Sequence, residues 1–256
     1  FRTHLNYIRC LENLLSNCTF NVFSKKRIEY NRSEIERFRK LYGVTKRSIQ
    51  KDMELSQEDQ AFAVIAVPWF PVKCYYALYY LESIFVHLID GALYGFGKGG
   101  HIGVRKKFYT LVCSKSILFS VSELNNAYSL SQIFKMPAIN IGLNTCADYW
   151  QKPECAESVL KKLMEYKLHD AKLGRKWNLH TKKHQEERAQ FIADEHLMLL
   201  DFFYWYRIKA NYRDLDYIDF ENGITEPEVF EYMQTYYSAF MHYAAKLVKQ
   251  IKVLNN

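Results

Sequence analysis

Apolar residues recur at helical spacing from the start of the chain. Residues 2–17 present an apolar face made of Leu5, Ile8, Leu11, Leu14 and Leu15, which predicts an amphipathic helix. A charged helix is expected over residues 34–54, where Ser33 and Glu36 have the spacing of a capping box. Gly43 is a point where this helix can be interrupted.

The most apolar stretch, residues 57–90, predicts the centre of the molecule. Pro68 and Pro71 fall within it, and proline removes a backbone donor, so a break or kink is expected near residues 67–71. From about 71 to 89 the pattern is apolar on most sides, which is typical of a central helix. Glycines at 91, 95, 97, 99 and 100 then predict a flexible loop.

Helical periodicity continues through the second half of the chain, with one weaker region. A helix is expected from about 101 to 113, and residues 114–170 are mixed until a short amphipathic helix over 154–172. One long helix is expected from about 186 to 212. The last helix, 226–254, begins at a capping box formed by Thr225 and Glu228.

These elements predict an all-α fold, an antiparallel bundle of helices near 71–89, 101–113, 187–213 and 226–252. The chain has no sustained strand-like alternation, and it contains only 10 Gly and 5 Pro, so few turns interrupt the helices.

Composition narrows the class of protein. A net charge of +7 permits binding to a phosphate backbone without establishing it. The six cysteines contain no CxxC pair, so we interpret them as reduced thiols of a cytoplasmic protein, mostly small core residues. No run reaches the roughly 18 apolar residues of a membrane span, so no membrane partner is expected.

Common catalytic signatures are absent. The sequence has no HExxH, no GxSxG and no phosphate loop ending in GK[ST], and the glycine run is better interpreted as a turn. His180 and His184 have the spacing of two metal ligands on one helix face, but Lys182 and Lys183 lie between them in a segment that looks solvated. We therefore expect no metal and no cofactor.

The segment that calls for a chemical explanation is "RIKANY", residues 207–212. Arg207 and Asn211 lie one helical turn apart. In one interpretation, Arg207 is paired with Asp201, Asp214 or Asp216 at the end of a buried helix. In the other, its planar donors bind a phosphate.

Three blocks of the sequence resemble one protein family. "KCYYALYYLESIF" at 73–85, "GGHIGVRKKF" at 99–108 and "RIKANYRD" at 207–214 have the order of the HEPN (higher eukaryotes and prokaryotes nucleotide-binding) family. The chain is most similar to stand-alone members with Arg-x4-Tyr in place of Arg-x4-6-His. The resemblance covers roughly 57–112 and 190–253. It implies a HEPN-type bundle over 55–256, with residues 1–54 as an N-terminal helical extension and 114–186 as an insertion.

The resemblance also implies a site and a homodimer. In catalytic members, an Arg and a His meet their copies across a dimer and cut RNA without metal. Arg207 matches the Arg, and Tyr212 stands at the place of the His. Because a phenol with a pKa near 10 is a poor general base at pH 7, His101 is the candidate acid or base if its loop folds over Arg207. Asn211 and Arg105 would then bind the substrate.

Two functions follow as expectations from this resemblance. The first is a HEPN-like protein that binds RNA or a nucleotide, either as a binder or as a metal-independent endoribonuclease of a toxin or phage-defence type. The alternative is a non-catalytic helical module that binds a protein partner, such as a nucleotidyltransferase or an antitoxin. In that case Arg207 has a structural role.

Overall fold

The computed structural model describes residues 2–23, 30–91, 100–136, 153–212 and 223–255. Its helices are α1 (Arg2–Asn17), α2 (Arg32–Glu58), α3 (Gln60–Ala66), α4 (Phe70–Asp90), α5 (Gly100–Cys113), α6 (Leu130–Lys135), α7 (Pro153–Gly174), α8 (Lys182–Asp194), α9 (Phe202–Tyr212) and α10 (Glu226–Asn255). The short elements are β1 (Phe20–Val22), β2 (Ile117–Phe119), β3 (Tyr128–Ser129), β4 (His196–Leu197), and the 3-10 turns Ser122–Leu124 and Leu199–Asp201. The predicted all-α character is confirmed.

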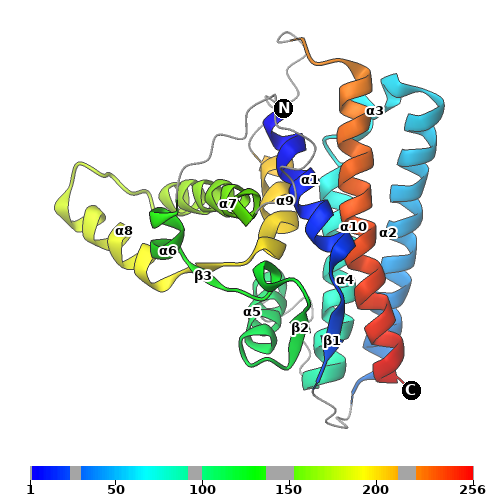
Figure 1. The fold of residues 1–256 in the computed structure, drawn as a ribbon, viewed down its shortest axis with the longest axis horizontal. Coiled ribbons are helices and arrows are strands. Elements are labelled where there is room, and N and C mark those ends of the chain that lie inside the picture. The colour runs from blue at the N-terminus through cyan, green and yellow to red at the C-terminus, as the bar shows by residue number, and fades with distance from the viewer. Residues whose placement is uncertain (1, 24–29, 92–99, 137–152, 213–222, 256) are drawn as a thin grey trace.

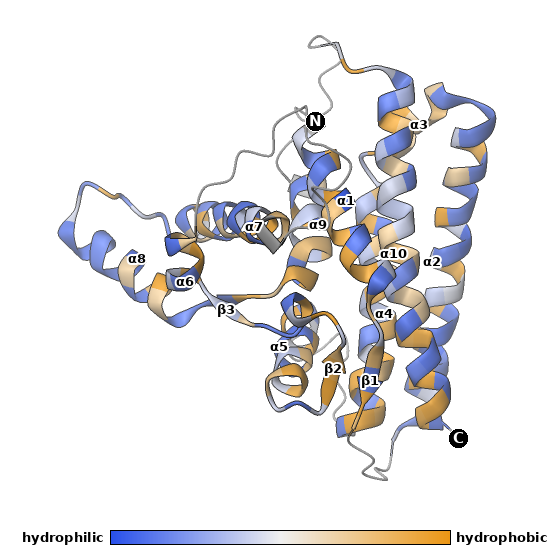
Figure 2. Cartoon of the chain, viewed as in Figure 1, coloured by the Kyte–Doolittle hydropathy of each residue, from blue (hydrophilic) through white to orange (hydrophobic). Residues whose placement is uncertain are grey.

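The core is built on long helices that run side by side. Helix α4 packs against α2 and α10, and α1 packs along α10 (Figure 1). The apolar positions of α4 and α10 lie inside this group, whereas α8, which has no buried residue, is mostly hydrophilic (Figure 2). Burial of the aromatic side chains Phe70, Tyr236 and Phe240 therefore joins these helices into one core.

The N-terminal segment is part of this core. The boundary expected at residue 54 falls inside α2, which continues to Glu58. Ile8 of α1 and Phe38 of α2 belong to the same buried cluster as Phe240 of α10. Residues 1–54, although they precede the region of family resemblance, are therefore part of the same hydrophobic core as the last helix.

The residue that caps the start of α2 differs from the predicted one, whereas the predicted cap of α10 is present in part. The side chain of Asn31, instead of Ser33, caps α2 by accepting a 3.3 Å hydrogen bond from the backbone N–H of Glu34. Helix α2 also continues through Gly43 without the expected interruption. At α10, the Glu228 carboxylate accepts a 2.9 Å bond from the backbone N–H of Thr225, as one arm of the predicted capping box requires.

The prediction of one long helix from about 186 to 212 is wrong, because the structure has two helices there, α8 and α9. The chain leaves α8 at Asp194, forms β4, which pairs antiparallel with β3, and turns through a 3-10 segment into α9. Leu197 in β4 is fully buried, and the backbone N–H of Leu130 donates to the Glu195 carbonyl at 2.9 Å. Pairing with a distant segment thus overrides the local helical pattern.

The break at the two prolines is confirmed. Helix α3 ends at Ala66 and α4 begins at Phe70, with Pro71 in its first turn, where proline is tolerated. In the described ranges no single helix is long and apolar enough to cross a membrane, and only α3 and α4 taken together, across a 64° bend, reach that length and composition. Cys10, Cys18, Cys74 and Cys155 are buried free thiols and Cys113 is an exposed one, while Cys146 lies outside the described residues.

Candidate functional site

Arg207 lies on α9 among three aromatic rings of α4 and α9. Its guanidinium carbon is 5.0 Å from the ring centre of Tyr75, 5.4 Å from that of Tyr204 and 5.8 Å from that of Tyr76. Its Nη1 donates a long hydrogen bond of 3.4 Å to the Tyr76 hydroxyl. The face of an aromatic ring attracts a cation within about 6 Å, so the rings hold the guanidinium without neutralising it.

No carboxylate pairs with Arg207 among the residues that the structure describes. Its Nε is buried and has no hydrogen-bond acceptor there. Asp201, one partner considered from the sequence, forms an ion pair with Arg105 instead, and Asp214 and Asp216 lie outside the described residues. A buried cationic donor without an acceptor is unfavourable for folding, so an acceptor that reached the Arg207 Nε would stabilise this arrangement.

His101 reaches the same aromatic group from the first turn of α5. Its Nδ1 lies 3.0 Å from the Tyr75 hydroxyl. The imidazole also packs against Tyr79 and Tyr76, with ring centres 4.1 and 5.3 Å away. His101 and Arg207 therefore share Tyr75 and Tyr76 as neighbours, although they are 106 positions apart in the sequence.

The surroundings keep His101 neutral. Burial, followed by the positive charges of Arg207 and Arg105, lowers the pKa of His101 to about 4. At pH 7 the imidazole can accept or donate a hydrogen bond, but it carries no charge. An imidazole with this pKa is a weak general base, so in this state the site is better suited to binding than to proton transfer.

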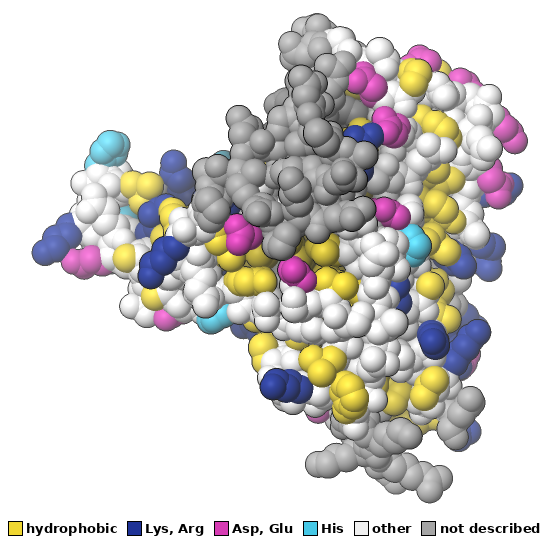
Figure 3. Space-filling view, viewed as in Figure 1, with side chains coloured by type: hydrophobic (Ala, Val, Ile, Leu, Met, Phe, Trp, Pro, Cys, Tyr) yellow, Lys and Arg dark blue, Asp and Glu magenta, His cyan; other side chains and the backbone are white. Residues whose placement is uncertain are grey.

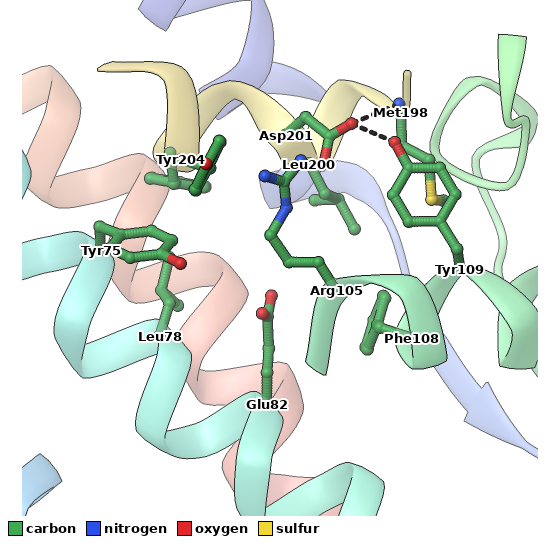
Figure 4. A pocket seen from close by; sticks show the side chains of 11 residues that line it. Tyr75, Leu78, Glu82, Arg105, Phe108, Tyr109, Met198, Leu200, Asp201 and Tyr204 are labelled. Atoms are coloured by element: carbon green, nitrogen blue, oxygen red, sulfur yellow. Dashed lines mark hydrogen bonds and ion pairs between the residues drawn. The ribbon is translucent and has the colours of Figure 1, made fainter. Parts of the chain in front are cut away.

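The Arg105 side chain is fixed by other side chains of the protein. Its guanidinium stacks 3.8 Å from the ring centre of Tyr204 and forms an ion pair with Asp201. The same carboxylate accepts hydrogen bonds from the Tyr109 hydroxyl and, at 2.9 Å, from the Met198 backbone N–H. Figure 4 shows this carboxylate held between α5 and the turn before α9. Arg105 thus fixes α5 against α9, next to Arg207.

A small cavity lies behind Arg105, and its volume of about 20 Å³ is enough for one water molecule. Glu82 points into it from α4 toward the Arg105 side chain (Figure 4). Burial raises the pKa of Glu82 to about 7, although a 2.8 Å hydrogen bond from the Tyr243 hydroxyl and the charge of Arg105 favour its ionised form. Glu82 therefore titrates close to neutral pH.

The other two predicted site residues are not placed. Helix α9 continues to Tyr212, but the side chains of Asn211 and Tyr212 lie outside the described residues. Their expected proximity to Arg207 remains a prediction. Of the five candidate residues, the structure brings three together, namely Arg207, His101 and Arg105.

The two histidines considered as a metal site do not share a helix, because α8 begins at Lys182, after His180. The Nδ1 of His184 accepts a 2.8 Å hydrogen bond from the Asn178 backbone N–H, at the turn into α8. The described ranges contain no group of three or more His, Cys, Asp or Glu side chains arranged to hold a metal ion.

Sequence reasoning missed Tyr75 and Glu82 as members of this group, and it considered Asp201 only as a partner of Arg207, not of Arg105. Glu82 had a detectable signal, because it is the one carboxylate between Phe70 and Ile89. Asp201 had a weaker signal as the residue before the aromatic run of α9. Tyr75 had none of its own, since it is one of 20 tyrosines in the chain.

Comparison with models of known protein families, with curated proteins and with solved structures finds no match. The geometry of Arg207, His101 and their aromatic neighbours is therefore the basis on which a function has to be argued.

Proposed function

We propose that this protein is a HEPN-like RNA- or nucleotide-binding protein, and that Arg207 receives a phosphate of the ligand. The observation behind the proposal is the state of the Arg207 guanidinium. It is held by rings, it has a buried Nε without an acceptor, and it has no carboxylate partner in the described part of the chain. A phosphate oxygen would supply the missing acceptor with a charge-assisted hydrogen bond.

The neighbouring side chains suit the same ligand. Tyr76, whose ring centre lies 5.8 Å from the Arg207 guanidinium carbon, is partly exposed on α4, and aromatic rings beside a cation are a platform on which nucleobases stack. His101 is neutral and can donate to a phosphate oxygen through one ring nitrogen. A bound phosphate would also raise the pKa of His101, because a nearby negative charge favours the imidazolium.

We further propose that the protein cleaves the RNA that it binds. In the free protein His101, with a pKa of about 4, is a weak base. Once an anion raises that pKa, His101 becomes a candidate acid or base, and Arg207 stabilises the charge developing on the phosphate. A second copy of the chain would complete the site across a two-fold axis, as the family resemblance implies. The activity proposed is that of a metal-independent endoribonuclease of a toxin or phage-defence type.

Binding and cleavage can be tested separately. Fluorescence polarisation with a labelled single-stranded RNA, in the presence of EDTA, measures binding. Arg207→Ala should weaken it by at least about tenfold, the effect of one charge-assisted contact. Arg39→Ala is the matched control, because Arg39 is an exposed arginine of α2 paired with Glu36. Equal affinity of both variants and wild type would leave Arg207 a structural residue and support the alternative of a protein-binding module.

Cleavage is read from the length of the same RNA after incubation in EDTA. Under this proposal wild type shortens the RNA, and Arg207→Ala and His101→Ala do not. RNA that stays intact with wild type while its affinity depends on Arg207 would restrict the function to binding.

A further inference from the structure

The end of α7, the turn after it and the first part of α8 form a basic extension, residues 172–188, which we call the basic arm. It projects from the body of the molecule (Figure 1). The arm carries six Lys or Arg and two Glu, a net charge of +4 out of +7 for the whole chain. Lys and Arg side chains predominate over acidic ones on this extension (Figure 3). The positive residues are Lys172, Arg175, Lys176, Lys182, Lys183 and Arg188.

The positive charges of the arm are largely uncompensated. Among the described residues only Lys182 of the arm forms an ion pair, with Glu186 at 3.9 Å, and these side chains are 89% and 68% exposed. Such an exposed pair contributes little. The nearest acidic residues on either side, Asp170 and Asp194, line the pocket between α5, α7 and α9. The arm therefore presents net positive charge to the solvent, and this attracts a polyanion.

A buried tryptophan fixes the turn of the arm. Trp177 is 4% exposed, and its ring packs edge-on against Phe191 of α8, with ring centres 5.5 Å apart. The guanidinium carbon of Arg175 lies 4.9 Å from the ring centre of Phe191 and 5.6 Å from that of Trp177. Because these contacts hold α7 and α8 together, a ligand meets charges that are already arranged, which lowers the entropic cost of binding.

Lys176 occupies a backbone position that favours glycine. Its φ is 52°, in the left-handed region. The Lys176 N–H donates to the Leu173 carbonyl at 3.3 Å, and the Trp177 N–H donates to the Lys172 carbonyl at 3.1 Å. These bonds end α7 in a Schellman motif, in which glycine is the usual residue at this place. A lysine here keeps a charged side chain at the turn although the backbone is strained.

The arm is connected to the Arg207 site by one surface. Helix α8 has no buried residue, so burial in the core does not explain its sequence. The pocket between α5, α7 and α9 is lined by both Arg175 of the arm and Tyr204 of α9. The ring centre of Tyr204 lies 5.4 Å from the Arg207 guanidinium carbon. A nucleotide chain with one phosphate at Arg207 therefore has a continuous surface that leads to the arm.

We propose that the basic arm binds the phosphate backbone of a single-stranded RNA, another part of which occupies the Arg207 site. The inference rests on the proposed RNA-binding function and adds a second set of contacts to it. The exposed side chains of Lys176, Lys182 and Lys183 make these contacts. Contacts to phosphates hold the strand without reading its sequence, so the arm raises the affinity for RNA of any sequence.

The salt dependence of RNA affinity tests the role of the arm. Fluorescence polarisation with a labelled single-stranded RNA in EDTA gives the association constant over a range of potassium chloride concentrations. Its logarithm falls with the logarithm of the salt concentration by about 0.7 for each phosphate contact to a single strand. The triple variant Lys176→Ala, Lys182→Ala, Lys183→Ala should therefore reduce this slope by about 2.

Residues 32–47 of α2 provide the matched control. This segment has the same net charge of +4, but two of its arginines are paired with its two glutamates. The control variant Lys40→Ala, Lys46→Ala, Arg47→Ala removes the same charge from side chains that form no ion pair in the described ranges. It should leave the slope at the wild-type value, because the effect depends on where the charges lie.

A pair of single variants separates RNA binding from folding. Lys115, exposed at the end of α5, has a φ of 55°, so its backbone conformation matches that of Lys176. Glycine relieves the strain at both positions, and neither Lys176→Gly nor Lys115→Gly should lower the melting temperature. Only Lys176→Gly should reduce the salt slope, by about 0.7.

The arm and the Arg207 site fail in distinguishable ways. If Arg207→Ala weakens RNA binding but the triple arm variant keeps the wild-type slope, the arm proposal is overturned and the Arg207 site stands. If the arm variant reduces the slope and Arg207→Ala has no effect, the arm contact stands and Arg207 is structural. Flotation with vesicles that contain phosphatidylserine tests a membrane surface. Vesicle binding that the arm variant abolishes, with an unchanged slope for RNA, would overturn the proposal.

Discussion

The Tyr75 hydroxyl of α4 and the Nδ1 of His101 on α5 lie 3.0 Å apart, within hydrogen-bonding distance. This contact holds the imidazole next to the aromatic rings that surround Arg207. Because the pKa of His101 is about 4, the contact joins two neutral groups at pH 7, and an anion entering the site changes that state.

The first prediction concerns His101 and acid pH. Its folded-state pKa of about 4 lies below the usual value of 6.5, so between these values the unfolded chain binds more protons. The free energy of unfolding should therefore fall as the pH decreases from about 6.5 to about 4. The loss attributable to His101 should be about 1–2 kcal/mol, since water screens a half-buried group.

Urea unfolding of wild type and His101→Gln at pH 7 and pH 4.5 measures this effect. The variant should lose less stability than wild type over this interval, because Gln does not titrate. An NMR titration gives the pKa of His101 directly. A pKa near 6.5 in the free protein would contradict the prediction, and an increase on adding RNA would support phosphate binding.

Glu82 should show the opposite pH dependence. Its folded-state pKa of about 7 lies above the usual value of 4.5, so the folded protein binds more protons between these values. Its contribution to stability is present at low pH and is lost as the pH rises through 7. A shift of this size corresponds to about 3 kcal/mol.

Urea unfolding of wild type and Glu82→Gln measures this effect. The Gln side chain does not titrate, and its amide oxygen can still accept the hydrogen bond from the Tyr243 hydroxyl. The variant should gain stability relative to wild type on going from pH 5 to pH 8. A constant difference over this range would mean that Glu82 is ionised throughout.

The ion pair of Arg105 and Asp201 should be structural. Its side chains are 17% and 4% exposed, so Asp201→Asn leaves a largely buried guanidinium unpaired. Breaking such a pair typically costs about 3–5 kcal/mol of folding free energy. Thermal and urea unfolding should show this loss, whereas Arg207→Ala should leave the melting temperature nearly unchanged.

Glu36→Gln is the control for this comparison. Glu36 forms an exposed ion pair with Arg39, with side chains 56% and 42% exposed, and its loss should cost at most about 1 kcal/mol. If Asp201→Asn is as stable as Glu36→Gln, the Arg105 pair does not hold α5 against α9.

The proposed two-fold site predicts a homodimer. Light scattering at micromolar concentration should give about twice the 30.5 kDa mass of the chain. A single species of 30.5 kDa across this concentration range would contradict a site shared between two copies, and phosphate binding would then have to be a property of the monomer.

The sequence by itself determined most of the helices. Apolar spacing located α1, α4 and α10 to within a few residues, and the prolines located the break before Phe70. These features depend on local rules, namely the helical period of buried faces and the missing donor of proline. Arg207 and His101, which share Tyr75 and Tyr76 as neighbours, were also named from the sequence, although only through the family resemblance.

Only the tertiary structure decided where the chain leaves the helical conformation that its local pattern favours, and which charged side chains form ion pairs. Residues 195–201 have a helix-compatible pattern, but pairing of Leu197 with Tyr128 and the Asp201–Met198 turn separate α8 from α9. Asp201 lies six residues before Arg207, yet it pairs with Arg105 of another helix. Such choices depend on which surfaces the core brings together, because an ion pair or strand pair forms only where burial places its partners within reach.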